Sequence, residues 1–246
     1  MHRIIFQTGL FIVYSYGLCV AVGFLLAAIL IVRDAKGAGV PVNGILDCLI
    51  AVFVGGIIGG RLLFVIINRE YYLQNPARAL MFYEGGLAFQ GAFILAVISG
   101  MVAARLKKIS FLKAADLIAP YIFLGQAFGR LGCFLNGCCY GRVTNSGFGV
   151  IYPGECVARI PVQAYSSLIL FILFAVLLRT RRNRTFDGYV FALYIILYSV
   201  FRFFMDFLRG DNLALIAGIR ISQLISITMF IAGIVFYAVL KRREFK

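Results

Sequence analysis

The sequence predicts an all-α membrane protein with about seven transmembrane helices. Hydrophobic residues make up 62% of the 246 positions, and the mean hydropathy is +0.95. Long apolar runs recur along the whole chain. This balance excludes a soluble globular domain, and repeated runs of this length are typical of polytopic helical membrane proteins.

The placement of charge is the third observation behind this class. The net charge is +14, and 13 of the 24 basic residues follow the first, third, fifth and seventh apolar runs. They are Arg33, Lys36, Arg105, Lys107, Lys108, Arg179, Arg181, Arg182, Arg184, Lys241, Arg242, Arg243 and Lys246. The positive-inside rule makes that side cytoplasmic, with the C-terminus there and the N-terminus outside. No basic stripe with interleaved aromatic residues is present, so nucleic acid is not an expected partner.

The apolar runs give the expected helices in order. The first covers 10–32 and is read as a retained helix, because it lacks a basic leader and a clear cleavage site. The second covers 45–67 and contains two overlapping GxxxG spacings, which favour close helix packing. The polar and aromatic segment 68–80 is expected at the membrane interface.

The remaining runs complete the bundle. The third opens with the segment 84–91 and ends at 104, and the others cover 117–135, 163–178, 188–208 and 221–240. The segment 139–162 is expected to be mostly loop, given its Gly, Asn, Pro and charged residues. No polar linker and no sequence repeat is evident, so 1–246 is expected to form a single membrane domain. The alternating topology brings the interfacial segment, this loop and the end of the sixth span to the outer side.

Residues 129–142 form the most informative motif. Here Arg130, Asn136, three cysteines and four glycines interrupt an apolar run. A charged side chain near membrane depth is costly and marks a functional interior. Non-helical backbone there is tolerated only where it lines a cavity. The motif is therefore expected to form the floor of a polar site.

A second group of charges lies on the sixth span. Arg202, Asp206 and Arg209 are spaced by four and three residues, which places them on one helical face. Arg61 and Glu84 supply further charge on the same side of the membrane. Because the guanidiniums outnumber the carboxylates, a phosphate is the expected partner, and a phospholipid headgroup is the expected ligand. Simple snorkelling of Arg209 to the interface is the plainer alternative.

The cysteines leave several roles open. Cys133, Cys138 and Cys139 are small packing residues in the plainest interpretation. A disulfide on the outer side, a zinc site and a nucleophilic thiol are the alternatives. The unusual spacing and the single histidine, His2, disfavour zinc. Neither a metal nor another cofactor is therefore expected. Tyr16 is either an interfacial tyrosine or a donor into the site.

Taken together, these residues resemble the bacterial prolipoprotein diacylglyceryl transferases. The family signature reads Gly-Arg-x-Gly-Asn-Phe-x-Asn-x-Glu-x-x-Gly. Six positions match it here: Gly129, Arg130, Gly132, Phe134, Asn136 and Gly141. The likeness also covers segments 16–17, 59–61, 84–89, 161–165, 202–209 and 222–223.

The resemblance implies an inner-membrane enzyme whose site faces the outer leaflet. Such enzymes move the diacylglyceryl group of phosphatidylglycerol to the lipobox cysteine in the signal peptide of a prolipoprotein. Arg130 and Arg202 would then hold the phosphate, with Asp206 and Tyr16 at further catalytic positions. The predicted substrate-binding residues are Arg130, Asn136, Gly141, Arg61, Glu84, Arg209, Cys133 and Cys138.

Three positions depart from the family pattern. Cys133 replaces the first asparagine, Cys138 replaces the glutamate, and Gln90 stands in place of a histidine. Gln90 is the counterpart of a catalytic position but cannot act as a base. The alternatives are thus a divergent phospholipid-dependent transferase that uses Cys138 or Cys139, and a lipid-binding membrane protein without activity.

Overall fold

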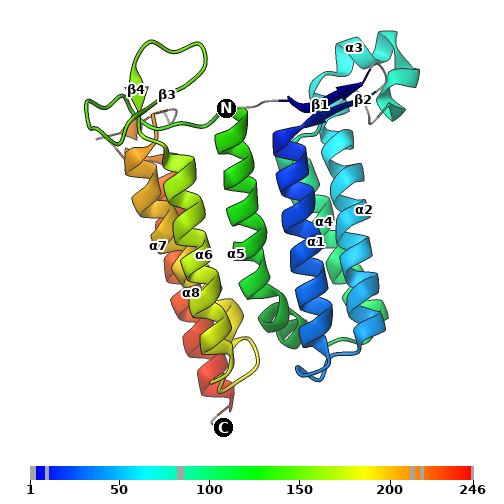
Figure 1. The fold of residues 1–246 in the computed structure, drawn as a ribbon. Coiled ribbons are helices and arrows are strands. Elements are labelled where there is room, and N and C mark those ends of the chain that lie inside the picture. Colours follow the sequence, from blue (N-terminus) through cyan, green and yellow to red (C-terminus); the bar gives the residue numbers. More distant parts are fainter. Residues whose placement is uncertain (1–3, 9–10, 82–85, 211–213, 217–218, 245–246) are drawn as a thin grey trace. The chain divides into compact units, whose positions relative to one another are not determined.

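Seven apolar helices dominate the computed structural model, which describes residues 4–8, 11–81, 86–210, 214–216 and 219–244. The membrane-length helices are α1 (Ser15–Ala35), α2 (Val42–Ile67), α5 (Phe111–Asn136), α6 (Val162–Arg181), α7 (Tyr189–Leu208) and α8 (Ile221–Glu244). The seventh, α4 (Phe89–Leu106), is apolar over a shorter stretch. This arrangement confirms the prediction of an all-α polytopic membrane protein (Figure 1).

Short elements connect these helices. The helical pieces are α3 (Arg69–Gln74) and the 3₁₀ turn η1 (Pro76–Leu80). Three two-stranded antiparallel hairpins pair β1 (Ile4–Thr8) with β2 (Phe11–Tyr14), β3 (Val150–Ile151) with β4 (Ala158–Arg159), and β5 (Ala214–Ile216) with β6 (Ile219–Arg220). The segment 139–162 is mostly loop, as predicted.

Of the predicted helix starts, two differ most from the structure. The first helix begins at Ser15 and not at residue 10, because residues 11–14 pair as β2 with β1. Their sequence, Phe-Ile-Val-Tyr, consists of residue types that favour strands. The fourth helix begins at Phe111, six residues before the predicted 117. Its first turns carry Lys113 and Asp116, whose charges hid this part of the helix from an apolar-run criterion.

The chain divides into two compact units, which are described separately. The first unit comprises residues 1–31 and 115–246, and the second comprises residues 32–114. In the first unit, α5, α6 and α7 share a buried core that includes Phe123, Ala127, Leu170 and Val190. Between helices that span a membrane, such contacts stabilise the core mainly through close van der Waals packing.

A buried carboxylate fixes the start of α7 in the first unit. Asp116 of α5 accepts hydrogen bonds from the backbone N–H groups of Gly188 at 2.8 Å and Phe191 at 2.9 Å. Asp116 is only 1% exposed. The first N–H groups of a helix have no partner within the helix, and they favour negative charge. Asp116 therefore caps α7 from a neighbouring helix.

Small residues set the packing of α2 against α4 in the second unit. A methyl group built on Gly59 would lie 2.3 Å from the carbonyl oxygen of Gly91, and one on Gly91 would lie 2.3 Å from that of Gly59. One on Gly55 would meet the Ser99 hydroxyl oxygen at 2.2 Å. Such close backbone approach is the role that small-xxx-small spacings play in membrane helices. The predicted function of this motif is confirmed.

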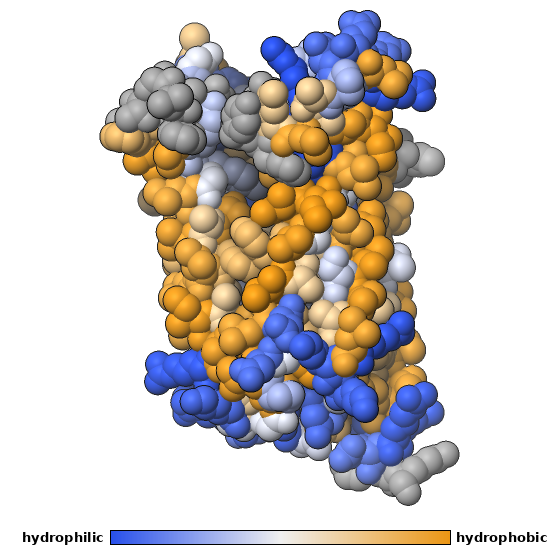
Figure 2. All heavy atoms as spheres, turned by 90° about the vertical axis from the view of Figure 1, so that its right-hand side faces the viewer, coloured by the Kyte–Doolittle hydropathy of each residue, from blue (hydrophilic) through white to orange (hydrophobic). Residues whose placement is uncertain are grey.

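On the face drawn in Figure 2, hydrophobic side chains cover the sides of the helices, and hydrophilic residues gather at their ends. Many of the apolar residues are exposed, such as Leu25, Ile29, Ile50 and Phe204 at 59%, 64%, 59% and 63%. Large exposed apolar surface on helices of this length is what a lipid-facing surface requires. The protein is accordingly a multi-pass membrane protein.

Candidate functional site

The last turn of α5 and the loop after it carry the sequence motif. The helix ends in a Schellman turn: the N–H of Cys138 donates to the carbonyl of Cys133 at 3.1 Å, and that of Gly137 to Phe134 at 3.1 Å. Gly137 has φ +70°, the left-handed conformation that this turn needs and that glycine adopts without strain. Arg130 lies on the helix before this turn, and the chain changes direction just beyond the helix end.

A buried ion pair lies near the end of α7. The guanidinium of Arg202 contacts the carboxylate of Asp206 at 3.2 Å, across the i, i+4 spacing noted in the sequence. The Asp206 side chain is fully buried, while that of Arg202 is 23% exposed. Arg220 donates to the backbone carbonyl of Asp206. Asp206 therefore orients Arg202 from inside the protein while part of the Arg202 side chain stays accessible.

Three arginines of the first unit form an arginine cluster: Arg130, Arg202 and Arg209. Arg202 lies within electrostatic range of both Arg130 and Arg209. Asp206 supplies one negative charge next to Arg202, so these four side chains together are net cationic. A net cationic group with forked donors suits a phosphate ligand. The structure thus brings together residues from α5 and α7 that are more than 70 positions apart.

Three thiols adjoin the arginine cluster. The sulfur atoms of Cys133, Cys138 and Cys139 all lie within 4.8 Å of one another, and we call them the thiol cluster. Cys139 adopts φ +64°, a left-handed conformation that is uncommon for a residue with a Cβ. All six cysteines lie in the described residues and carry free thiols, and Cys156 is exposed. The structure therefore contains no disulfide among the described cysteines.

Hydrogen bonds polarise the thiol cluster. Donation from the Cys133 thiol is the main cause that holds the pKa of the Cys139 thiol below its ordinary value, and the Cys138 thiol acts in the same direction. The positive charges of Arg209 and Arg130 lower this pKa further. A nearby cation favours the thiolate form of a cysteine. These effects together favour the thiolate form of Cys139.

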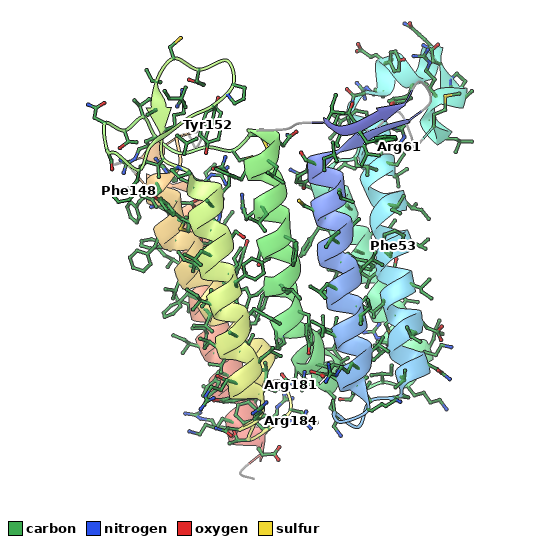
Figure 3. The ribbon with its side chains drawn as sticks, in the orientation of Figure 1. Phe53, Arg61, Phe148, Tyr152, Arg181 and Arg184 are labelled. Atoms are coloured by element: carbon green, nitrogen blue, oxygen red, sulfur yellow. The ribbon has the colours of Figure 1, made fainter. Side chains whose placement is uncertain are left out.

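Side chains outside the predicted set hold the loop in place. The Gln163 amide donates to the carbonyl of Cys138 at 2.6 Å and accepts from the Tyr152 hydroxyl at 3.0 Å. Both side chains are almost fully buried, and Tyr152 lies in the loop beyond α5 (Figure 3). Gln163 was not predicted as a site residue, although a glutamine two residues after Pro161, at the start of an apolar run, was a usable signal.

Gly141 joins this loop to the end of α7. Its N–H donates to Ile160 at 2.9 Å, and the next N–H, of Arg142, donates to the carbonyl of Leu208 at 3.0 Å. A methyl group on Gly141 would lie 2.6 Å from the Leu208 oxygen. Gly141 therefore serves close backbone packing beside Arg209, with which it forms a β-bridge.

Helix α1 contributes Tyr16 to the same unit. A methyl group on Gly132 would lie 3.2 Å from the Tyr16 Cα and 3.0 Å from the Cys19 Cβ, so α1 packs on α5 at this glycine. The Tyr16 phenol lies within electrostatic range of Arg130 and of the three thiols. Tyr16 is 44% exposed. Tyr16 is thus near the arginine and thiol clusters, as the sequence suggested it could be.

The other predicted residues are placed as follows. Asn136 is the final residue of α5, and Gln90 lies, exposed, in the first turn of α4 in the second unit. Glu84 lies outside the described residues. Arg61 is 3% exposed and donates to the backbone carbonyls of Arg78, Ala79, Met81 and Gly86, at 2.6–3.2 Å. Arg61 thereby holds the segment that follows α3 (Figure 3).

Fold and site together define a polytopic helical membrane protein with a cationic, thiol-lined site at one end of its first unit. Comparison with known proteins identifies the family. The model of the family described as prolipoprotein diacylglyceryl transferase matches residues 3–239. The chain belongs to this family.

Curated relatives agree over almost the full length. A phosphatidylglycerol–prolipoprotein diacylglyceryl transferase of Clostridioides difficile is 35% identical over 244 residues, covering 99% of this chain and 97% of the relative. The proteins of the same name from Clostridium tetani and Geobacter sulfurreducens are each 36% identical. They cover 95% and 93% of this chain, and 96% and 91% of their own lengths.

Proposed function

We propose that this protein transfers the diacylglyceryl group of phosphatidylglycerol to the lipobox cysteine of prolipoproteins, as a step in lipoprotein biogenesis. The observation that carries this proposal is the family match over nearly the whole chain. The arginine cluster supports it, because both the donor lipid and the released glycerol phosphate are phosphate esters. Phosphatidylglycerol and a prolipoprotein are also the compounds in the names of the relatives.

The reaction assigns a part to the arginine cluster. The thiol of the acceptor cysteine loses its proton to solvent and its sulfur forms a bond to the glyceryl carbon, while the bond from that carbon to the phosphate oxygen breaks. Negative charge grows on the departing phosphate, where Arg130 and Arg202 stabilise it. Asp206 keeps Arg202 in position, and Arg209 and Tyr16 complete the phosphate site. Preorganised donors of this kind usually supply the largest part of such a rate enhancement.

The site lies toward the outer leaflet of the bacterial inner membrane in this proposal. Arg181 and Arg184, which belong to the basic set predicted as cytoplasmic, lie at the opposite end of the first unit from Tyr152 (Figure 3). The thiol cluster and the arginine cluster are on the Tyr152 side, since Gln163 links Tyr152 to Cys138. A prolipoprotein signal peptide would reach that side after export.

Complementation tests the proposal directly. The chain is expressed in a bacterium depleted of its own transferase, and lipid attachment to a reporter prolipoprotein is followed by its gel mobility and by mass spectrometry. We expect growth and lipidation to be restored by this chain and not by its Arg202→Ala variant at matched membrane levels. Correct membrane insertion without any lipidation of the reporter would contradict the proposed function.

A further inference from the structure

We propose that Cys133, Cys138 and Cys139 bind one thiophilic divalent metal ion, with zinc as the best match. Their sulfur atoms already lie within 4.8 Å of one another. A zinc–sulfur bond is about 2.3 Å, so three sulfurs on one ion lie roughly 4 Å apart. The three thiols therefore need only a small movement to close on a single ion.

The backbone builds this arrangement from residues that are close in sequence. The Schellman turn folds Cys138 back over Cys133, and the left-handed conformation of Cys139 turns the next thiol toward the same point. Gln163 fixes the Cys138 carbonyl from α6. The spacing that disfavoured zinc at the level of sequence is thus resolved by two left-handed positions on either side of Cys138, Gly137 and Cys139.

Charge balance favours an occupied site. Three thiolates around a divalent ion carry a net charge of minus one, since each thiol loses its proton on binding. Arg130 lies within electrostatic range of Cys133 and Cys139, and Arg209 within range of Cys139. Two adjacent cations stabilise such an anionic complex. Sulfur ligands also select zinc and related soft ions over magnesium or calcium.

Three protein ligands leave one position of a tetrahedral ion open, which is the pattern of catalytic zinc sites. This extension rests on the proposed function, whose acceptor is a thiol. A metal-bound thiol is deprotonated outright, so the acceptor cysteine would release its proton to solvent. Its sulfur would then bond to the glyceryl carbon while the carbon–oxygen bond breaks and glycerol phosphate leaves. The ion would supply the thiol activation that Gln90 cannot.

Metal binding is tested on the purified full-length protein without using activity. Bound zinc is measured by elemental analysis, and cadmium is titrated while its sulfur-to-metal charge-transfer absorbance is recorded. We expect about one equivalent per chain in the wild type. Each of Cys133→Ser, Cys138→Ser and Cys139→Ser should weaken binding at least tenfold, since even residues around the ligands change metal affinity by 10–100-fold.

Cys156→Ser is the matched control, because Cys156 is an exposed thiol in the same loop, and it should bind cadmium like the wild type. Equal cadmium binding by wild type and the three cluster variants would overturn the metal site. A disulfide between two cluster thiols in the protein as purified, detected by counting alkylated cysteines, would overturn it as well.

A chelator experiment separates this proposal from the proposed function. Transfer to a lipobox peptide that stops after chelation and returns with zinc supports the activating role. Full transfer by the metal-free protein would overturn that role and leave the proposed function intact. Stoichiometric metal binding without transfer in any state would support the metal site and contradict the proposed function.

Discussion

At the residue scale, Asp206 acts on Arg202 and is itself shielded from any ligand. Its side chain is fully buried and its carboxylate lies 3.2 Å from the guanidinium. We expect Asp206→Ala to destabilise the protein by about 1–3 kcal/mol, because Arg202 loses its buried partner. Thermal unfolding in detergent measures this loss. Asp206→Ala and Arg202→Leu together should cost less than the sum of the two single variants, and strict additivity would argue against coupling.

An acid-sensitive contact is expected in the loop between α5 and α6. Glu155 accepts from the Tyr140 hydroxyl at 2.7 Å and from Arg159 at 3.0 Å. The Tyr140 hydrogen bond, followed by that of Arg159, holds the pKa of Glu155 below its ordinary value. A lowered pKa in the folded state means that Glu155 stabilises the loop above the ordinary glutamate pKa of about 4.3. That contribution disappears as the pH falls through its folded pKa.

Hydrogen exchange across the loop checks this expectation. We expect protection of residues 141–160 to fall below pH ~4, after correction for intrinsic exchange rates. Glu155→Gln should exchange faster at pH 6 and show no such step, since glutamine does not titrate. An unchanged acid step in that variant would assign the effect to another group.

At the element scale, the loop is attached to α7 through a position that admits no side chain. A methyl group at Gly141 would lie 2.6 Å from the Leu208 oxygen and from Val162 Cγ2. Overpacking of this kind typically costs about 1–3 kcal/mol. Gly141→Ala should therefore lower the unfolding temperature and loosen the loop. Gly147→Ala is the matched control in the same loop, with open space around the new methyl group, and should leave both unchanged.

The crossing of α2 and α4 offers a second matched pair. Gly59→Ala would place a methyl group 2.3 Å from the Gly91 carbonyl oxygen, whereas Gly56→Ala on the same helix meets its neighbours at 3.7 Å or more. We expect Gly59→Ala to lower the unfolding temperature in detergent and Gly56→Ala to have little effect. Equal behaviour of the two variants would show that this close approach contributes nothing to stability.

At the scale of the whole molecule, the sequence predicts the helices well because their signal is local. Apolar runs alone identify seven helices, and the Arg202–Asp206 pair follows from helical spacing alone. The starts of α1 and α5 were misplaced where strand-forming residues or a buried Asp116 interrupt the apolar pattern. These two helix starts depend on tertiary contacts, which cannot be predicted from composition.

The site was predictable in part for the same reason. The motif identified Arg130 and the cysteines, but the mutual distance of the three sulfurs depends on the Schellman turn and on the conformation of Cys139. The roles of Gln163 and Tyr152 require contacts between residues 11 to 25 positions apart. Arg61 was predicted to bind substrate from its charge alone, and its hydrogen bonds to four backbone carbonyls could not be predicted from the sequence.

The most direct measurement is transfer by the purified protein in phosphatidylglycerol vesicles with a lipobox peptide. The account predicts a thioether-linked diacylglyceryl peptide and glycerol phosphate in equal amounts. Arg202→Ala should reduce the rate about 10²–10³-fold, the usual loss on removing one transition-state donor. Arg182→Ala, an exposed arginine at the far end of α6, should retain the full rate. An Arg202→Ala variant as fast as the wild type, or no lipid on the peptide from folded wild-type protein, would contradict the account.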